Sequence, residues 1–333
     1  MEIEVLTSLN GTDSLKEQWD KLVTEAGNTI FSKYAFTKNY GRFYSDLAEP
    51  KIYIANADGR IVGIAPLAEE NGVLKFATGL DYKTVADYND FIVHPQYSKE
   101  VLNAFTGILK DHRKFKLKEI PETSSTVNYF RDNNIGIIND SEEPSSFITL
   151  PQTLEQYDLM LKDSYKKSLK RFNSNFSSVE LRSLKNESDL EKWMDDFMDM
   201  HQTEWNEKEM SGCFADDEKH TRFRKFHREI ARDLFKDGNL ELLRLEADGN
   251  TVALAYGFND AETVYNYLGS INLNFKKYSP GRIIGMYWIR DSINKKKRKF
   301  DFLRGYEEYK KGFGVTWAQS KTIASDYGQL HGL

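Results

Sequence analysis

The chain has 333 residues, of which 40% are hydrophobic and 29% charged, with a formal net charge of −5. These fractions exclude a disordered chain and predict a globular protein of about two domains. The acidic balance argues against DNA binding, and the single cysteine, Cys213, excludes an internal disulfide and a cysteine-rich zinc site. The acidic start Met1–Glu4 and the lack of a run of about 18 apolar residues predict a cytoplasmic protein without a membrane span.

Two segments 190 positions apart predict the same β-meander. Strands Lys51–Ala57 and Ile61–Leu67 flank Asp58-Gly59, and strands Leu240–Glu246 and Thr251–Phe258 flank Asp248-Gly249. An Asp-Gly pair between apolar runs is a strong hairpin signal, because glycine accepts the positive φ of the turn. The register continues into a third strand, 73–78 against 263–268. The ungapped match indicates an internal duplication, and two unrelated meanders with the same turn chemistry are the alternative.

Apolar residues at helical spacing predict helices around both meanders. These stripes run over Leu15–Val23, Val101–Leu109, Leu190–His201 and Phe223–Leu234, and a further strand is predicted at Phe115–Ile120. The polar stretch Asn139–Pro151 predicts the boundary between the halves. Leu154–Phe172 predicts a lysine-rich helical insert.

The segment from Leu268-Gly269 to Ile293 predicts an anion-binding helix start. Ser279 suits the N-cap and Pro280 the first helical position, while Gly281 leaves the backbone exposed. Unpaired N–H groups at such a terminus carry partial positive charge and suit a pyrophosphate, to which Arg282 adds a charged donor. A well-capped helix start without a ligand is the alternative. Gly281 and Gly285 on one face are also expected to let the helix approach a sheet closely.

Together with pieces elsewhere in the chain, this segment resembles a known family. The sequence is similar to the CelD/BcsL-type acyltransferases of the GNAT superfamily, which are related to the FemAB peptidyl transferases. The pieces that carry the resemblance are Leu150-Pro151 with Tyr157, Lys166–Arg171, His201 with Trp205, Gly238–Leu245, Ser279-Pro280-Gly281, Phe300–Gly305 with Tyr309-Lys310, Gly63–Leu67 and Asp87–Asp90. One departure is Glu204, which precedes Trp205 where the family often has a basic residue.

The resemblance implies an α/β (α+β) fold of two tandem GNAT-like domains, each a mixed, mostly antiparallel sheet flanked by helices. Residues 1–145 are then a domain without a donor cradle that shapes the acceptor cleft. Residues 146–333 are the domain with the acyl-donor site, including the helical insert 154–172. At the 190 offset, Ser279-Pro280-Gly281 falls on Asn89-Asp90-Phe91, so only one donor site is expected.

The implied function is an acyl-CoA-dependent N- or O-acyltransferase acting on a cell-envelope polysaccharide, an amino sugar or a precursor, with acetyl-CoA as donor. The thioester is expected between strands 263–268 and 299–303, near backbone N–H groups that stabilise the oxyanion. Two alternatives stay open: a FemAB-like transferase that uses aminoacyl-tRNA, and a non-catalytic GNAT-like module of a polysaccharide synthesis system. Expected partners are a saccharide or small-molecule acceptor and polysaccharide biosynthesis enzymes; tRNA belongs only to the first alternative.

Candidate site residues follow from the same resemblance. The general base is sought among Asp301, Glu204 and His201, and Tyr309 is the candidate acid for the leaving thiolate. His201 also continues an apolar stripe, Glu204 also fits a solvated helix position, and Asp301 also fits a structural pair with Arg304 or Lys310. The expected donor contacts are Tyr267, Leu268, Gly269, Ser279, Pro280, Gly281, Arg282 and Ile283, and the expected substrate contacts are Trp205, Arg304, Lys310, Tyr88 and Asp90.

Basic runs and metal-binding patterns complete the sequence predictions. The lysine-rich face of Lys162, Lys166 and Lys170 fits donor phosphates, an anionic carrier or tRNA, with a solvated face as the alternative. The run 295–299 suits a helix C-terminus. The six histidines lack metal-ligand spacing such as His-x-x-x-His, so no metal is predicted. No Cys-His arrangement is apparent for Cys213.

Overall fold

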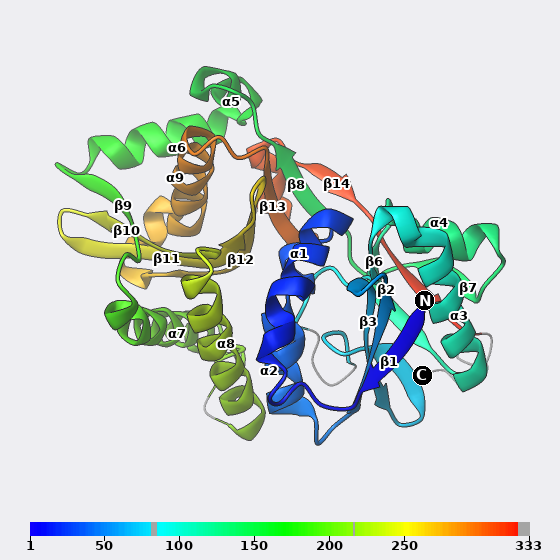
Figure 1. Ribbon diagram of the computed structural model, residues 1–333. Coiled ribbons are helices and arrows are strands. Elements are labelled where there is room, and N and C mark those ends of the chain that lie inside the picture. The colour runs from blue at the N-terminus through cyan, green and yellow to red at the C-terminus, as the bar shows by residue number, and fades with distance from the viewer. Residues whose placement is uncertain (81–84, 216, 326–333) are drawn as a thin grey trace. The chain divides into compact units, whose positions relative to one another are not determined.

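The computed structural model describes residues 1–80, 85–215 and 217–325, which divide into two compact units. The first unit comprises Met1–Pro144 together with the chain from Gln319 on, and the second comprises Ser145–Ala318 (Figure 1). Each unit combines mostly antiparallel strands with flanking helices, which confirms the predicted fold class. Within these described ranges, no helix combines the length and the apolar composition needed to cross a membrane.

The first unit contains a five-stranded and a three-stranded sheet. The first has the order β1-β2-β3-β4, with β5 paired to β3, and the second has the order β6-β15-β7. The strands are β1 (Glu2–Leu6), β2 (Glu49–Ala57), β3 (Arg60–Glu70), β4 (Val73–Phe76), β5 (Ile92–Val93), β6 (Lys116–Pro121), β7 (Ile137–Asp140) and β15 (Ser320–Ala324). The helices are η1 (Asp13–Leu15), α1 (Lys16–Ala26), η2 (Ile30–Ser32), α2 (Tyr34–Tyr44), η3 (Pro95–Tyr97), α3 (Ser98–His112) and α4 (Ser125–Asp132).

The second unit has one seven-stranded sheet of order β14-β8-β13-β12-β11-β10-β9. Helices α6 and α9 cover one face and α7 and α8 the other (Figure 1). The strands are β8 (Ser145–Thr149), β9 (Val179–Ser183), β10 (Leu240–Ala247), β11 (Asn250–Asn259), β12 (Thr263–Ile271), β13 (Lys299–Arg304) and β14 (Thr316–Ala318). The helices are α5 (Leu154–Met160), α6 (Asp163–Ser174), η4 (Glu187–Asp189), α7 (Leu190–Glu207), α8 (Glu218–Lys236), η5 (Leu273–Tyr278), α9 (Pro280–Asn294) and η6 (Glu308–Phe313).

The two β-meanders have the same turn conformation and a register shift at the same position. Asp58 and Gly59 have φ values of 51° and 73°, and Asp248 and Gly249 have 46° and 77°, the left-handed conformations that a tight hairpin turn requires. A register shift follows Ala55 in the first hairpin and Leu245 in the second, which are again 190 positions apart. A shared bulge at the same offset supports the predicted duplication.

The 190 offset does not extend beyond the third strand. Helix α3 occupies the place in chain order that α9 occupies in the second unit, but it begins at Ser98 rather than at position 90, where the offset places it. Asn89-Asp90-Phe91 therefore precedes the helix and is not the counterpart of Ser279-Pro280-Gly281. The segment between β4 and α3 is longer than the segment between β12 and α9, so the 190 offset no longer aligns the two helix starts.

The predicted domain boundaries need one correction at the C-terminal side. The second predicted domain ran to residue 333, whereas β15 pairs with β6 and β7 of the first unit. The chain passes into the second unit after β7 and returns to the first after β14. Hydrogen bonding between strands, which chain order does not reveal, decides this membership. The predicted helical insert 154–172 consists of two helices, α5 and α6.

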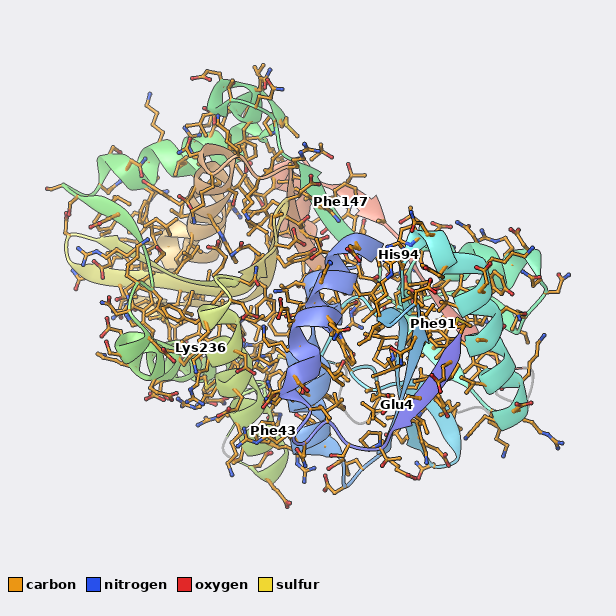
Figure 2. All side chains as sticks on the ribbon, in the orientation of Figure 1. Glu4, Phe43, Phe91, His94, Phe147 and Lys236 are labelled. Atoms are coloured by element: carbon orange, nitrogen blue, oxygen red, sulfur yellow. The ribbon has the colours of Figure 1, made fainter. Side chains whose placement is uncertain are left out.

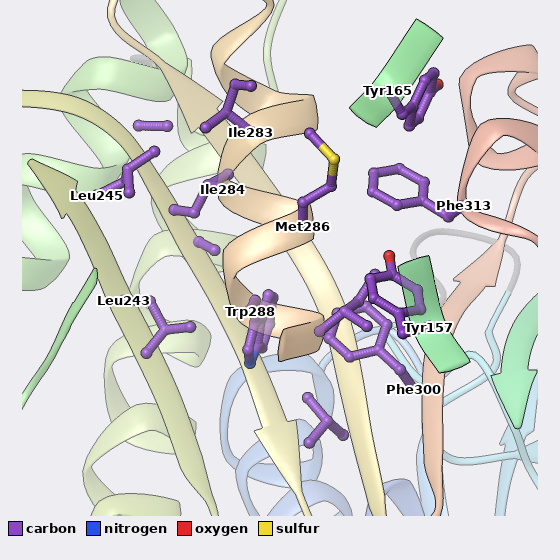
Figure 3. Close-up of a cluster of buried hydrophobic side chains, with 14 of the residues drawn as sticks. Tyr157, Tyr165, Leu243, Leu245, Ile283, Ile284, Met286, Trp288, Phe300 and Phe313 are labelled. Carbon is purple, nitrogen blue, oxygen red and sulfur yellow. The ribbon is translucent and has the colours of Figure 1, made fainter. Parts of the chain in front are cut away.

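The core of the second unit lies between α9 and the sheet. Ile283, Ile284 and Trp288 of α9 are buried against Leu243 and Phe300 (Figure 3). A Cβ at Gly285 meets the Phe313 ring at 3.0 Å, so this glycine lets η6 rather than a strand approach the helix. For Gly285 the expected approach to a sheet is therefore wrong, whereas a Cβ at Gly281 would face Ile271, the last residue of β12, at 3.5 Å. A second core cluster, around α3 and β3, belongs to the first unit.

Candidate functional site

Strands β12 and β13 of the second unit separate after a short parallel pairing. Their paired positions end at Tyr265 opposite Asp301, although β12 continues to Ile271. The strand on the other side, β11, pairs with β12 along its whole length and contains a register shift at Tyr256-Gly257. A Cβ on Gly257 would lie 2.0 Å from the carbonyl oxygen of Tyr265, so glycine is required there. Beyond Tyr265, one edge of β12 has no strand partner.

The start of α9 differs in detail from the predicted cap. Ser279 lies in the left-handed region at φ 57°, and its side chain makes no capping hydrogen bond. Its carbonyl instead accepts the N–H groups of Arg282 at 2.9 Å and Ile283 at 3.2 Å. The prediction that the Ser279 side chain caps the helix is therefore wrong, because its backbone carbonyl accepts the N–H groups instead. Pro280 is the first helical residue, as predicted, and only the Gly281 N–H of this turn lacks an acceptor in the described part of the chain.

Gly281 is exposed and has no structural need to be glycine. Its φ is not positive, and a Cβ there would meet only Ile271 Cγ2 at 3.5 Å, an ordinary contact. Around it lie cations without a carboxylate within ion-pairing distance among the described residues: Lys276, Lys277 and Arg282. An exposed N–H beside three uncompensated cations is a favourable place for an anion.

Helix α6 is held beside the start of α9 by aromatic contacts. The ring centroids of Phe172 and Phe176 lie 5.7 and 5.3 Å from that of Tyr278. The Arg282 guanidinium stacks over the ring of Tyr165 at 4.3 Å, and its buried Nε has no hydrogen-bond partner in the described structure. These contacts bring helix α6 to the same corner of the unit as the start of α9.

Asp301 is a fully buried residue of β13 whose carboxylate is already engaged. Its Oδ1 accepts the Leu303 N–H at 2.8 Å, and its Oδ2 lies 2.7 Å from Lys299 Nζ. Lys299 is thus an ion-pair partner of Asp301 that the sequence analysis did not name. Leu303 has a φ of 63°, a strained value for a branched residue, so Asp301 holds the bulge at the end of β13.

The end of β13 is fixed by a second buried charge. Lys310 Nζ donates to the carbonyls of Arg304 at 3.0 Å and Gly305 at 2.9 Å, and pairs with Glu307 at 2.7 Å. Lys310 is only 2% exposed, so its contacts are those of a backbone clamp. Tyr309 differs, because its side chain is exposed and its hydroxyl bonds to no described residue. Arg304 is half-buried.

The C-terminal turn of α7 brings together Glu204, His201 and Trp205. Glu204 accepts the backbone N–H of Ile271, at the end of β12, at 3.2 Å and pairs with Lys208 at 2.7 Å. His201 Nε2 accepts from the Trp205 indole at 3.0 Å. Cys213 Sγ lies 3.8 Å from the same nitrogen, a contact that the residue spacing did not suggest. A loop, invisible to residue spacing, produces that contact.

His201 is neutral in the folded protein and is expected to make the protein acid-sensitive. Burial lowers its pKa to about 4, and the nearby Lys208 charge acts in the same direction. Because the folded pKa lies below the unfolded value, stability is complete above pH 6.5 and is lost as the pH falls toward 4. A shift of this size corresponds to about 3 kcal/mol. His201→Phe should flatten the dependence of the unfolding free energy on pH between 7 and 4.5, measured in urea, and an unchanged dependence would contradict the prediction.

Four of the predicted donor contacts, three on β12 and Ile283 on α9, differ in how buried they are. Tyr267 is the extra residue of the β12 bulge, and its ring packs 5.2 Å from His227 and 5.3 Å from Phe258. Leu268 is half-buried and Gly269 exposed, and both lie on the stretch of β12 beyond the pairing with β13. Ile283 is fully buried in the core. Of these four, Leu268 and Gly269 are the positions with accessible backbone.

Tyr88 and Asp90 belong to the first unit, where both line a cavity of about 360 Å³. Tyr88 is buried, and Asp90 Oδ1 is buried without a hydrogen-bond partner in the described residues. Burial raises the pKa of Asp90 to about 6, against the lowering effect of hydroxyls at Ser124 and Thr126. These two residues are thus part of a built cavity in the first unit.

Sequence reasoning missed the parts of the site that tertiary contacts assemble. Tyr165 was not singled out, since nothing local predicts that it stacks on Arg282. Lys276-Lys277, two residues before Ser279, carried a signal that was available, because cations next to a helix start reinforce an anion site. In the described chain, no group of three or more His, Cys, Asp and Glu side chains has a metal-binding arrangement.

Comparison with known proteins identifies the second unit. Residues 162–311 match the family model described as acetyltransferase (GNAT) domain. The matched residues lie wholly within the second unit. They include the separated strands β12 and β13 and the start of α9, so the candidate donor corner lies wholly within them. No curated protein matches the sequence.

Solved structures resemble the whole chain in fold. FemX superposes with a TM-score of 0.68 at 11% identity, covering 100% of each chain. A conserved protein of unknown function from Bacteroides thetaiotaomicron gives 0.60 at 12% identity, covering 97% of this chain and 99% of that one. L-PGS from Bacillus licheniformis gives 0.60 at 9% identity, covering 94% and 92%. At such low identities the likeness concerns the fold alone.

Proposed function

We propose that the protein is an acyl-CoA-dependent N- or O-acyltransferase whose donor binds in the second unit. The observation that carries this proposal is the separation of β12 from β13 after Tyr265, directly before the exposed start of α9. An unpaired strand edge presents backbone N–H and C=O groups to an extended, amide-containing chain. The pantetheine arm of CoA is such a chain, and its diphosphate would reach Gly281.

The charges around Gly281 support a diphosphate at this corner. Lys276, Lys277 and Arg282 have no carboxylate to neutralise them in the described chain, and the Gly281 N–H has no acceptor. Arg282 is oriented by its stacking on Tyr165 and keeps an unpartnered Nε. A bound diphosphate would satisfy these donors together.

Glu204 is the proposed general base. Asp301 is fully buried, and His201 is buried with Nε2 occupied by the Trp205 indole. Glu204 accepts the Ile271 N–H with one carboxylate oxygen and pairs with Lys208 through the other, but its side chain is 13% exposed. The acceptor nitrogen or hydroxyl oxygen attacks the thioester carbonyl carbon while Glu204 takes its proton. The C–S bond then breaks, and Tyr309, a residue 44% exposed, protonates the CoA thiolate.

The oxyanion formed in this reaction would be stabilised by backbone N–H groups of β12 near Leu268 and Gly269, where no β13 partner competes. The class of acceptor, a cell-envelope polysaccharide, amino sugar or precursor, rests on the family resemblance, as does acetyl-CoA as donor. Enzymes of polysaccharide biosynthesis are the corresponding partners.

A second candidate is a FemAB-like transferase that uses aminoacyl-tRNA. It is favoured by α6, where Lys167, Lys170 and Arg171 are exposed without ion-pair partners in the described structure. An extended cationic helix face suits a polyphosphate backbone. The charge reversals Lys167→Glu and Lys170→Glu distinguish the two candidates, because tRNA binding should weaken and lose salt dependence while CoA binding should change little.

Calorimetry and a thiol-release assay test the leading proposal. The full chain should bind CoA and acetyl-CoA with micromolar dissociation constants and release thiol when amino sugars are supplied. Glu204→Gln should lower turnover by about 100-fold or more at unchanged CoA affinity, as expected for a lost general base. Glu207→Gln, one turn further on the same helix, is the matched control. Absence of CoA binding would refute the proposal.

A further inference from the structure

The cavity of the first unit lies at the start of α3, and the described part of its wall is polar and contains no cation. Asn28, Thr29, Ser32, Asn89, Asp90 and Ser124 contribute amides, hydroxyls and one carboxylate to its wall. Phe91, labelled in Figure 2, also lines it, and none of its described lining residues is lysine, arginine or histidine. The volume of about 360 Å³ lies within the range of small-molecule sites.

Two buried oxygens in this wall have no hydrogen-bond partner in the described residues. They are Asp90 Oδ1 and Thr29 Oγ1, which come from segments far apart in the chain. Native proteins rarely leave such groups unsatisfied, because each forfeits the hydrogen bonds it would make to water. Oxygens that lack protein partners but share a cavity are suited to donors on a bound molecule.

The wall is held in place independently of any ligand. Asn28 Nδ2 donates to the Phe91 carbonyl at 3.2 Å and joins the loop after α1 to the segment that carries Asp90. The Asn89 N–H donates to the Glu119 carbonyl at 2.9 Å. Ser124 Oγ accepts the Thr126 N–H at 2.9 Å and caps α4. A cavity preorganised in this way loses little entropy when it binds a ligand.

The chemistry of this corner is opposite to that of the related corner in the second unit. There, α9 begins among Lys276, Lys277 and Arg282. Here, Asp90 and Ser98, the first residue of α3, line one cavity, and the described lining contains no cation. A phosphate entering the first unit would meet a buried carboxylate without a compensating charge. An ammonium group would instead neutralise that carboxylate, and hydroxyls would bond to the amides and serines around it.

We propose that the first unit binds a compact, hydroxyl-rich ligand bearing an ammonium group, with its ammonium on Asp90 and a hydroxyl on Thr29. An amino sugar is the class of molecule that meets these requirements. That this ligand is the acyl acceptor rests on the proposed function, whereas its binding to the cavity does not. Phosphorylated and carboxylated sugars are excluded by the same charge.

Retaining Asp90 is expected to cost stability at neutral pH. Because its folded pKa is raised from 3.8 to about 6, the folded protein is most favoured where Asp90 is protonated, below pH 4, and loses stability as the pH rises through 6. The shift corresponds to at most about 3 kcal/mol. Asp90→Asn should therefore be more stable than the wild type at pH 7.5 and nearly equal to it at pH 4, measured by denaturant unfolding.

Titration of the full-length chain with D-glucosamine, followed by NMR or calorimetry, tests the binding proposal. We expect a dissociation constant below about 10 mM, with D-glucose and D-glucosamine 6-phosphate binding at least about tenfold more weakly. Asp90→Asn should weaken glucosamine binding by about tenfold or more while raising the melting temperature at pH 7.5. Thr29→Val, which removes only the hydroxyl, should weaken it less.

The matched control is Asp132→Asn, the same substitution on the exposed end of α4, which should bind glucosamine like the wild type. The proposal is overturned if glucosamine fails to bind, if Asp90→Asn binds it as tightly, or if the phosphorylated sugar binds equally well. CoA affinity, measured on the same variants, separates the two proposals. A variant that loses glucosamine binding but keeps CoA binding is altered in this cavity alone. A variant that loses CoA binding but keeps glucosamine binding is altered in the donor site alone.

Discussion

Replacing Gly281 with aspartate is expected to reduce the affinity for CoA by at least about 100-fold, because a carboxylate would occupy the proposed diphosphate position and pair with the cations around it. The substitution should leave the fold intact, since a Cβ at Gly281 meets only Ile271 Cγ2 at 3.5 Å and the backbone φ is not left-handed. Calorimetry of CoA binding, with circular dichroism to verify folding, measures the effect.

Two control variants test whether the effect on CoA binding comes from the negative charge at position 281. One adds bulk without charge, and the other adds the same charge elsewhere. Gly281→Ala should weaken CoA binding by less than about tenfold, because alanine favours a helix and adds no charge. Gly107→Asp places the same change on α3, where a Cβ has open space, and should not alter CoA binding. If Gly281→Asp bound CoA like the wild type, the diphosphate would have to lie elsewhere.

Replacing Asp301 with alanine is expected to lower the free energy of unfolding by about 3 kcal/mol. The change leaves the buried Leu303 N–H without an acceptor and removes the partner of Lys299. It also frees the bulge that holds Leu303 at a φ of 63°. Urea unfolding measures the loss, and Asp291→Ala, on the surface of α9, should cost less than about 1 kcal/mol.

Asp301→Asn decides between a positioning and a catalytic role. Asparagine keeps an oxygen that can accept the Leu303 N–H, so we expect CoA affinity to be retained and turnover to fall much less than in Glu204→Gln. A folded Asp301→Asn protein with normal CoA affinity and turnover reduced by about 1,000-fold would make Asp301 the base. In that case Glu204 would only anchor Ile271.

Local sequence patterns were sufficient for the parts of the fold that depend on short-range chemistry. The Asp-Gly turns, the strands around them and the helix beginning at Pro280 follow from turn geometry, alternation and the fixed φ of proline, and the structure confirms them. The equal bulges after Ala55 and Leu245 extend the predicted repeat. Each of these features involves residues close together in the chain.

Features formed by distant segments required the tertiary structure. The return of β15 to the first unit depends on strand pairing across about 180 residues, and the Cys213–His201 contact depends on a loop. Asp301 was correctly placed on a strand, but its pairing with Lys299 depends on which direction the bulged strand turns the carboxylate.

The sequence by itself determined the repeated hairpins, the helix start at Ser279-Pro280-Gly281 and the residues available for chemistry, because turn and helix propensities act over a few residues. Only the tertiary structure decided that β12 separates from β13, that Arg282 stacks on Tyr165 and that Asp90 lines a cavity whose described wall contains no cation. Those outcomes depend on the burial and charge of groups that folding brings together, which no local pattern encodes.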